Sequence, residues 1–133
     1  MNTPVSFEIA KLLKEKGFDI PCWSYYSSLN LYTFELGDWN NHTIGDTSMH
    51  KRNAGYYSAP TIVEVVMWLY EKHGIWINGG LYAHLGNVSK FQFTIESQKS
   101  KSTNSIVQLN INPFNSPAEA YEAAIEYTLK NLL

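Results

Sequence analysis

The chain has 133 residues and lacks most of the sequence features that usually identify an enzyme or a ligand-binding protein. Its one cysteine, Cys22, excludes an internal disulfide and a cysteine-based zinc cluster. A formal net charge of −2 gives no general attraction to nucleic acid or to acidic membranes. No stretch approaches the ~20 apolar residues of a membrane span, and the Walker, GxGxxG, HExxH and GxSxG patterns are absent. We therefore expect no cofactor, no membrane association and no enzyme activity.

The N-terminal sequence, MNTPVSFEIAKLL, lacks the basic region and long apolar core of a secretory signal. We therefore expect a cytoplasmic protein. The chain length fits a single domain over residues 1–133, large enough to bury a core without disulfides. Aromatic residues are plentiful, with nine Tyr, six Phe and four Trp, and we expect them to supply much of that core.

The segment SAPTIVEVVMWLYEKHGIWI, residues 58–77, predicts a helix that runs directly into a strand. Thr61 and Glu64 have the spacing of a capping box at the helix start. Gly74 suits the left-handed position after the helix end. Between these signals only Glu64 is polar before the last turn, and a helix that is apolar nearly all round is covered on both sides. Either this helix is sandwiched inside the fold, or a partner chain buries one of its faces.

Other segments follow the periodicities of helices and strands. A proline after a capping residue predicts a helix start at Thr3-Pro4, and Gly17 predicts its end, with Phe18 folding back on Leu13. The remaining expected elements are an edge strand at 22–26, strands at 31–36, 75–83, 91–95 and 107–111, and a helix from Ser116 to about Asn131. Their order, α-β-β-α-β-β-β-α, predicts an α+β fold with three helices and an antiparallel sheet of about four to five strands.

Residues 37–58 are rich in Gly, Asp, Asn, Thr and Ser and predict a long loop. Four residues with metal-ligand side chains recur there at every fourth position, namely Asp38, His42, Asp46 and His50. On a continuous helix they would form a ladder able to bind a divalent metal. The glycines and the polar run oppose a helix, so we interpret the segment as a solvated loop without a metal site.

Cys22 and one of the four histidines are the residue types of a nucleophile and its base. A lone cysteine beside Trp23 is more typical of a small buried apolar side chain, and no pattern marks an oxyanion site. We therefore expect no catalytic residue here.

Aromatic residues outside the clear core pattern are candidates for an interaction surface. Trp76 alternates with two isoleucines and so points to the opposite face of its strand. The candidate surface consists of Trp76, Tyr56, Tyr57, Trp23, Lys51 and Arg52. Such residues are typical of a protein interface, for example that of a homodimer. They could also bind single-stranded nucleic acid, with the rings stacking on bases and the basic residues contacting phosphates. The negative net charge favours the protein interface.

Three segments, residues 3–22, 57–77 and 116–133, together resemble a family of small uncharacterised proteins. That family belongs to phages, prophages and mobile elements of gut Bacteroides-like bacteria. The resemblance carries no catalytic residue or ligand. It implies a cytoplasmic accessory protein of mobile-element origin rather than a housekeeping enzyme. The sequence thus predicts a non-catalytic, self-associating interaction protein, with a nucleic-acid-binding accessory protein and a metal-dependent enzyme as the alternatives.

Overall fold

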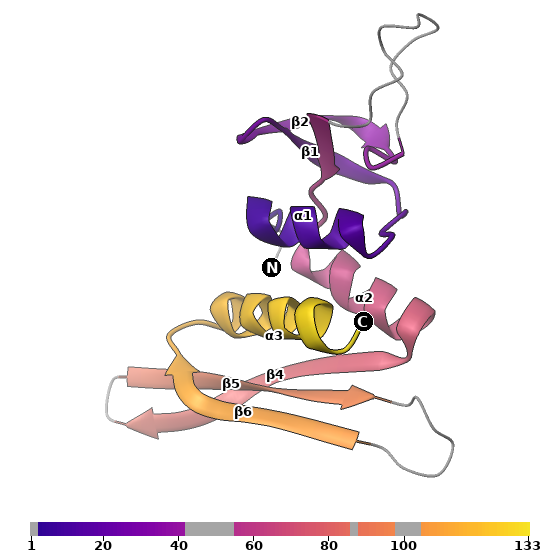
Figure 1. The fold of residues 1–133 in the computed structure, drawn as a ribbon. Coiled ribbons are helices and arrows are strands. Elements are labelled where there is room, and N and C mark those ends of the chain that lie inside the picture. Colours follow the sequence, from indigo (N-terminus) through magenta and orange to yellow (C-terminus); the bar gives the residue numbers. More distant parts are fainter. Residues whose placement is uncertain (1–2, 42–54, 86–87, 98–104) are drawn as a thin grey trace, which may run out of the picture. The chain divides into compact units, whose positions relative to one another are not determined.

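The computed structural model describes residues 3–41, 55–85, 88–97 and 105–133 (Figure 1). Chain length predicts one domain, and the contacts between residues divide the chain into two compact units. The N-terminal unit ends at Thr61, and the C-terminal unit begins at Ile62.

The N-terminal unit contains a helix and a three-stranded antiparallel sheet in the order β2-β1-β3. Its elements are α1 (Phe7–Glu15), β1 (Cys22–Ser27), β2 (Asn30–Gly37) and β3 (Tyr56–Ser58). The prediction of an edge strand at 22–26 is wrong, because β1 is the central strand. Pro21 precedes β1 and so removes no ladder hydrogen bond from it. The second side of β1 pairs with β3, with Tyr25 opposite Ser58.

The start of α1 differs from the prediction at Thr3. The helix begins at Phe7, and the Ser6 hydroxyl accepts a hydrogen bond from the Ile9 N–H at 3.4 Å. Pro4 instead forms an isolated antiparallel bridge with the segment before the next helix. The predicted proline start was wrong because a better cap stood three residues further on.

The predicted end of α1 is confirmed. Gly17 has a φ of +84°, the left-handed conformation that glycine adopts without strain. The Phe18 N–H then donates to the Leu13 carbonyl at 2.9 Å, the hydrogen bond of a Schellman ending. Both side chains are buried.

The buried residue Asn40 connects the segment that follows β2 with the strand β3. The Asn40 amide nitrogen donates to the Phe18 carbonyl at 2.8 Å, and its amide oxygen accepts from the Ser58 N–H at 2.8 Å. The Asn40 N–H donates in turn to the Ser58 hydroxyl at 3.1 Å. Asn40 and Ser58 therefore form a reciprocal pair that satisfies buried polar groups of both segments.

The C-terminal unit contains two helices and a second three-stranded antiparallel sheet, in the order β4-β5-β6. Its elements are α2 (Ile62–His73), β4 (Ile75–Leu85), β5 (Val88–Ser97), β6 (Ser105–Phe114) and α3 (Pro117–Asn131). α3 lies over one face of this sheet (Figure 1). Buried apolar residues alternate along the described parts of β4 and β5, as the sequence predicts for a half-buried strand; they are Ile75, Ile77, Phe93 and Ile95.

The predicted start of α3 and the predicted end of α2 are confirmed. The Ser116 hydroxyl accepts from the Glu119 N–H at 3.2 Å, and the Glu119 carboxylate accepts from the Asn115 N–H at 3.1 Å. α2 ends at His73, and the next residue, Gly74, has a φ of +64° and donates its N–H to the Tyr70 carbonyl at 3.0 Å. Cap residues and glycines therefore located these helix ends.

The predicted α+β class with antiparallel pairing is confirmed, and the described residues contain three helices. The described strands number six, because β3 lies inside the segment 37–58 that was expected to be a loop. They form two sheets of three strands, whereas the sequence predicted a single sheet. Among the described residues, no helix combines the length and the apolar character that crossing a membrane requires.

Candidate interaction surface

One face of α2 exposes an apolar stripe. Val63, Met67 and Tyr70 are 47%, 41% and 47% exposed, respectively. Their spacing of four and three residues places them on one line along the helix. We call these three residues the α2 stripe. The opposite side of the helix is buried through Ile62, Val65, Trp68 and Leu69. The helix is therefore covered on one side only, which excludes the first of the two alternatives, a helix sandwiched inside the fold.

Trp76 extends the α2 stripe onto β4. The Tyr70 and Trp76 rings meet edge to face, with centroids 5.5 Å apart and planes at 79°. Trp76 is 39% exposed, whereas its strand neighbours Ile75 and Ile77 are buried. Trp76 thus points away from the core face of the sheet, as the alternation predicts.

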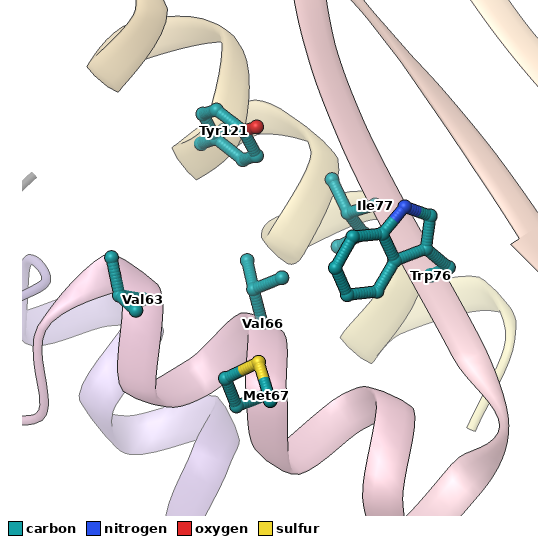
Figure 2. Close-up of a pocket in the computed structure, with 6 residues that line it drawn as sticks. All are labelled: Val63, Val66, Met67, Trp76, Ile77 and Tyr121. Carbon is teal, nitrogen blue, oxygen red and sulfur yellow. The ribbon is translucent and has the colours of Figure 1, made fainter.

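An apolar pocket of about 160 Å³ opens beside the stripe, between α2, β4 and α3. Figure 2 shows its wall of α2 side chains facing Tyr121 of α3 and the β4 residues. We call it the α2 pocket; its lining residues are Val63, Val66, Met67, Trp76, Ile77 and Tyr121. The lining contains no carboxylate, imidazole, thiol or ammonium group. Such a pocket can bind an apolar group, and the phenol of Tyr121 is the one titratable group among its lining residues.

Gly79 on β4 sets the position of the Tyr121 ring. A Cβ atom at Gly79 would lie 2.8 Å from Cε2 of Tyr121, closer than side-chain atoms approach one another. The absence of a side chain at residue 79 therefore lets the ring lie against the strand and form one wall of the α2 pocket.

Acidic side chains border one flank of the stripe. Glu64 follows Val63 and Glu71 follows Tyr70, so the two carboxylates lie seven residues apart on the same side of α2. The other flank begins with Val66, which leads into the α2 pocket. The surface is therefore apolar along its centre and negative along one border.

The N-terminal unit exposes a second aromatic surface on its sheet. The Tyr25 ring stacks on Trp39 at 4.2 Å and on Tyr32 at 5.5 Å, and it meets the Tyr56 ring edge-on at 5.3 Å. Trp23, on the same strand as Tyr25, is 58% exposed. Burial raises the pKa of the Tyr25 phenol above its ordinary value, and the neighbouring Tyr56, Tyr32 and Glu35 raise it further. We call these rings the N-terminal aromatic face.

The other face of this sheet is covered by α1. Phe7 meets the rings of Tyr26 and Tyr57 edge-on, at 5.5 and 5.3 Å. The Lys14 ammonium lies 4.8 Å over the Tyr57 ring and donates to the Tyr56 carbonyl at 2.7 Å. Burial lowers the pKa of Lys14 below its ordinary value. Tyr57 is therefore half-buried in the packing of this unit.

The predicted surface residues are distributed over both units. Trp76 belongs to the C-terminal unit, whereas Trp23, Tyr56 and Tyr57 belong to the sheet of the N-terminal unit. Tyr57 faces α1, and Tyr56 is part of the N-terminal aromatic face. Lys51 and Arg52 lie outside the described residues, and so do His42, Asp46 and His50 of the predicted metal ladder.

Cys22 and Asp38 both have structural contacts. The Cys22 thiol is buried and donates to the Ser24 carbonyl at 3.3 Å, and its own carbonyl accepts from the Trp39 indole at 3.0 Å. One Asp38 carboxylate oxygen accepts from the Asn41 side chain at 2.8 Å. In the part of the chain that the structure describes, no three His, Cys, Asp or Glu side chains gather as a metal site.

Sequence reasoning did not single out Val63, Met67 and Tyr70. The signal was present, because apolar residues at steps of four and three form a stripe by themselves. It was hidden by the apolar residues on the opposite face of the same helix. Tyr32 was missed for a similar reason, since its strand was interpreted as ordinary core alternation.

Comparison with protein-family models, with curated proteins and with solved structures finds no match to this chain. The function must therefore be argued from the two surfaces described above.

Proposed function

We propose that this chain is a non-catalytic interaction protein that self-associates through the α2 stripe, Trp76 and the α2 pocket. The observation that carries the proposal is the continuity of these features. Three exposed apolar residues on α2 lead to an exposed tryptophan on β4 and border a pocket with an apolar lining. Contiguous exposed apolar surface of this kind is typical of sites where proteins bind.

The composition of the surface supports a protein partner. Trp, Tyr and Met are enriched at protein interfaces, and a tryptophan or tyrosine often supplies much of the binding energy. A stable interface buries roughly 800 Å² on each partner, so residues around the stripe must take part as well. A cytoplasmic accessory role in a phage or mobile element remains part of the proposal, and it is supported by the family resemblance of the three sequence segments.

Sedimentation of the purified full chain tests self-association. We expect a dimer whose fraction rises with protein concentration, and we expect Met67→Glu to shift it to monomer with unchanged circular dichroism. Leu29→Glu is the matched control, because Leu29 is an apolar residue in the β1–β2 turn that is 75% exposed. The Leu29→Glu variant should dimerise like the original chain. A soluble, folded chain that stays monomeric at every concentration contradicts the proposal.

The N-terminal aromatic face supports a second candidate function, the binding of single-stranded nucleic acid. Its exposed rings, Trp23 and Tyr32, are of the type on which bases stack. The predicted phosphate contacts, Lys51 and Arg52, lie outside the described residues. Fluorescence anisotropy with a labelled oligonucleotide should then show binding that weakens with salt and with Trp23→Ala. Absence of binding at low salt excludes this function.

A further inference from the structure

The strand β2 has one side open to a further strand. Among the described residues it pairs with β1 only, so it lies at the edge of its sheet. Edge strands are usually shielded by lysine, by proline or by being very short. β2 has eight residues and contains neither lysine nor proline. Its side chains Leu31, Tyr32 and Leu36 are exposed. The edge is therefore available to an extended segment of another chain.

The register of the sheet identifies the backbone groups that face the open side. The Ala59 N–H donates to the Ser24 carbonyl at 2.9 Å, so the backbone of Ser24 faces β3 rather than β2. Ser24 and Thr33 are therefore a non-hydrogen-bonded pair, and their hydroxyl oxygens lie 2.9 Å apart. The alternation of the ladder then directs the N–H and C=O groups of Leu31 and Thr33 to the open side. An added strand can form hydrogen bonds with these backbone groups.

A row of aromatic rings ends at the same edge. Tyr25 and Tyr32 lie directly opposite each other and stack, and Tyr25 also stacks on Trp39. Tyr32 is the member of the row that belongs to the edge strand, and its side chain is 45% exposed. A residue directly opposite Tyr32 on an added strand would have its Cβ about 4.5–5.5 Å from the Tyr32 Cβ. Its side chain would therefore lie against the exposed ring.

The charge of this sheet selects the kind of side chain that fits there. Glu35 is the only charged residue in the three strands, and it is exposed. Its carboxylate lies near enough to the Tyr25 phenol to raise the pKa of that group. The face of an aromatic ring attracts cations, and an arginine guanidinium both stacks on rings and pairs with carboxylates. The rings and the carboxylate therefore complement arginine and disfavour phosphate.

The opposite face of the same sheet already contains a contact of this type. There the Lys14 ammonium of α1 lies 4.8 Å over the Tyr57 ring. The chain thus supplies its own cation to one face of the sheet. On the N-terminal aromatic face, the strands contribute rings and Glu35 but no basic side chain.

We infer that the open edge of β2 binds an extended segment of a partner protein, and that this segment places an arginine side chain on the Tyr32 ring within reach of Glu35. The backbone of the segment bonds to Leu31 and Thr33, and its arginine occupies the N-terminal aromatic face. The site lies wholly within the N-terminal unit. It is therefore separate from the α2 stripe and goes beyond the proposed self-association.

Titration of the isotope-labelled full chain with peptides, followed by NMR, tests the site. The probe is a seven-residue peptide of alternating threonine and valine in which arginine replaces the central valine. The control peptide has citrulline, the neutral isostere of arginine, at the same position. We expect the arginine peptide to shift the amide resonances of Leu31 and Thr33. At low ionic strength its dissociation constant should be about two- to fivefold lower than that of the citrulline peptide.

Variants of the chain separate charge from shape. Glu35→Gln should abolish the preference for arginine over citrulline, because the amide keeps the shape of the carboxylate without its charge. Glu8→Gln is the matched control, since Glu8 is exposed on α1 and changes the net charge equally. It should leave the preference unchanged. Tyr32→Leu should raise the dissociation constant of the arginine peptide about two- to fivefold.

The outcomes also separate this inference from the other functions. Equal affinity for the two peptides, no binding of either at millimolar concentration, or unshifted resonances of Leu31 and Thr33 overturns the inference. An oligonucleotide that shifts these resonances when the arginine peptide does not overturns it in favour of the nucleic-acid function. Met67→Glu, which removes the proposed dimer, should leave peptide binding unchanged, so self-association is tested separately.

Discussion

The ring of Tyr121 lies on the bare backbone of Gly79, so that a Cβ there would come within 2.8, 3.1 and 3.2 Å of three ring atoms. This contact joins α3 to β4 at the wall of the α2 pocket. Because helix and strand meet through a glycine, the shape of the pocket depends on a residue that does not itself line it.

The first prediction concerns this contact. Gly79→Ala should displace the Tyr121 ring, because the new methyl group and the ring cannot occupy the same space. We expect a loss of about 1–3 kcal/mol in the free energy of unfolding, measured by denaturant titration. Tyr121→Leu in the Gly79→Ala background should recover part of it, since a leucine does not reach as far. Full stability of Gly79→Ala would contradict the close approach.

The second prediction concerns the buried amide of Asn40. Asn40→Ala leaves the Phe18 carbonyl and the Ser58 N–H without their side-chain partner. We expect the free energy of unfolding to fall by about 2–4 kcal/mol, since each buried polar group without a partner costs about 1–3 kcal/mol. Asn41→Ala is the matched control, because the Asn41 side chain donates to Asp38 at the surface. It should cost less than about 1 kcal/mol by the same measurement.

The third prediction concerns the turn between β1 and β2. Ser28 has a φ of +49°, in the left-handed region that costs an L-residue roughly 1 kcal/mol. Ser28→Gly should therefore raise the midpoint of thermal unfolding, and Gly17→Ala, at a φ of +84°, should lower it. The Cβ of Gly17→Ala would meet nothing within 4 Å, so backbone strain alone accounts for its effect. Equal midpoints for both variants would refute this explanation.

The fourth prediction concerns the alkaline stability of the N-terminal unit. The pKa of Tyr25 is raised in the folded chain, so the folded state retains the phenolic proton at pH values where the unfolded state loses it. The stability that Tyr25 contributes is complete below the ordinary tyrosine pKa near 10 and is lost as pH rises through the folded pKa. In urea titrations above about pH 10, Tyr25→Phe should therefore lose stability with pH less steeply than the original chain.

Lys14 provides the comparison of opposite sign. Its pKa is lowered by burial, so the unfolded state holds the proton at pH values where the folded state has released it. Stability from this group therefore rises with pH as the lysine loses its proton in the folded chain. Lys14→Met should make the alkaline loss of stability steeper, whereas Tyr25→Phe makes it shallower. The same direction for both variants would contradict the assigned causes.

The sequence predicted those parts of the fold that local chemistry determines. Gly17, Gly74 and Ser116 mark helix ends in the sequence, and the structure has the same ends, because a cap or a left-handed residue acts within one turn. The alternation of Phe93 and Ile95 likewise predicted the buried face of β5. Each of these signals lies within a few residues of the feature that it determines.

The remaining parts depend on contacts between residues that are distant in the sequence. β3 has three residues and pairs with a strand about thirty positions earlier, and no periodicity can appear in so short a segment. This pairing also makes β1 a central strand. For α2, the sequence showed that nearly every face is apolar, but it did not show which face the chain covers. The exposed stripe at Val63, Met67 and Tyr70 became evident only from burial.

The reciprocal hydrogen bonds between Asn40 and Ser58 have a consequence for protein engineering. These hydrogen bonds connect Asn40, which precedes residues 42–54 in the chain, with Ser58, which follows them. Each residue donates its backbone N–H to the side chain of the other, so either side chain is needed for one of the two hydrogen bonds. An engineered version of the chain should therefore keep both Asn40 and Ser58 while the two surfaces are studied.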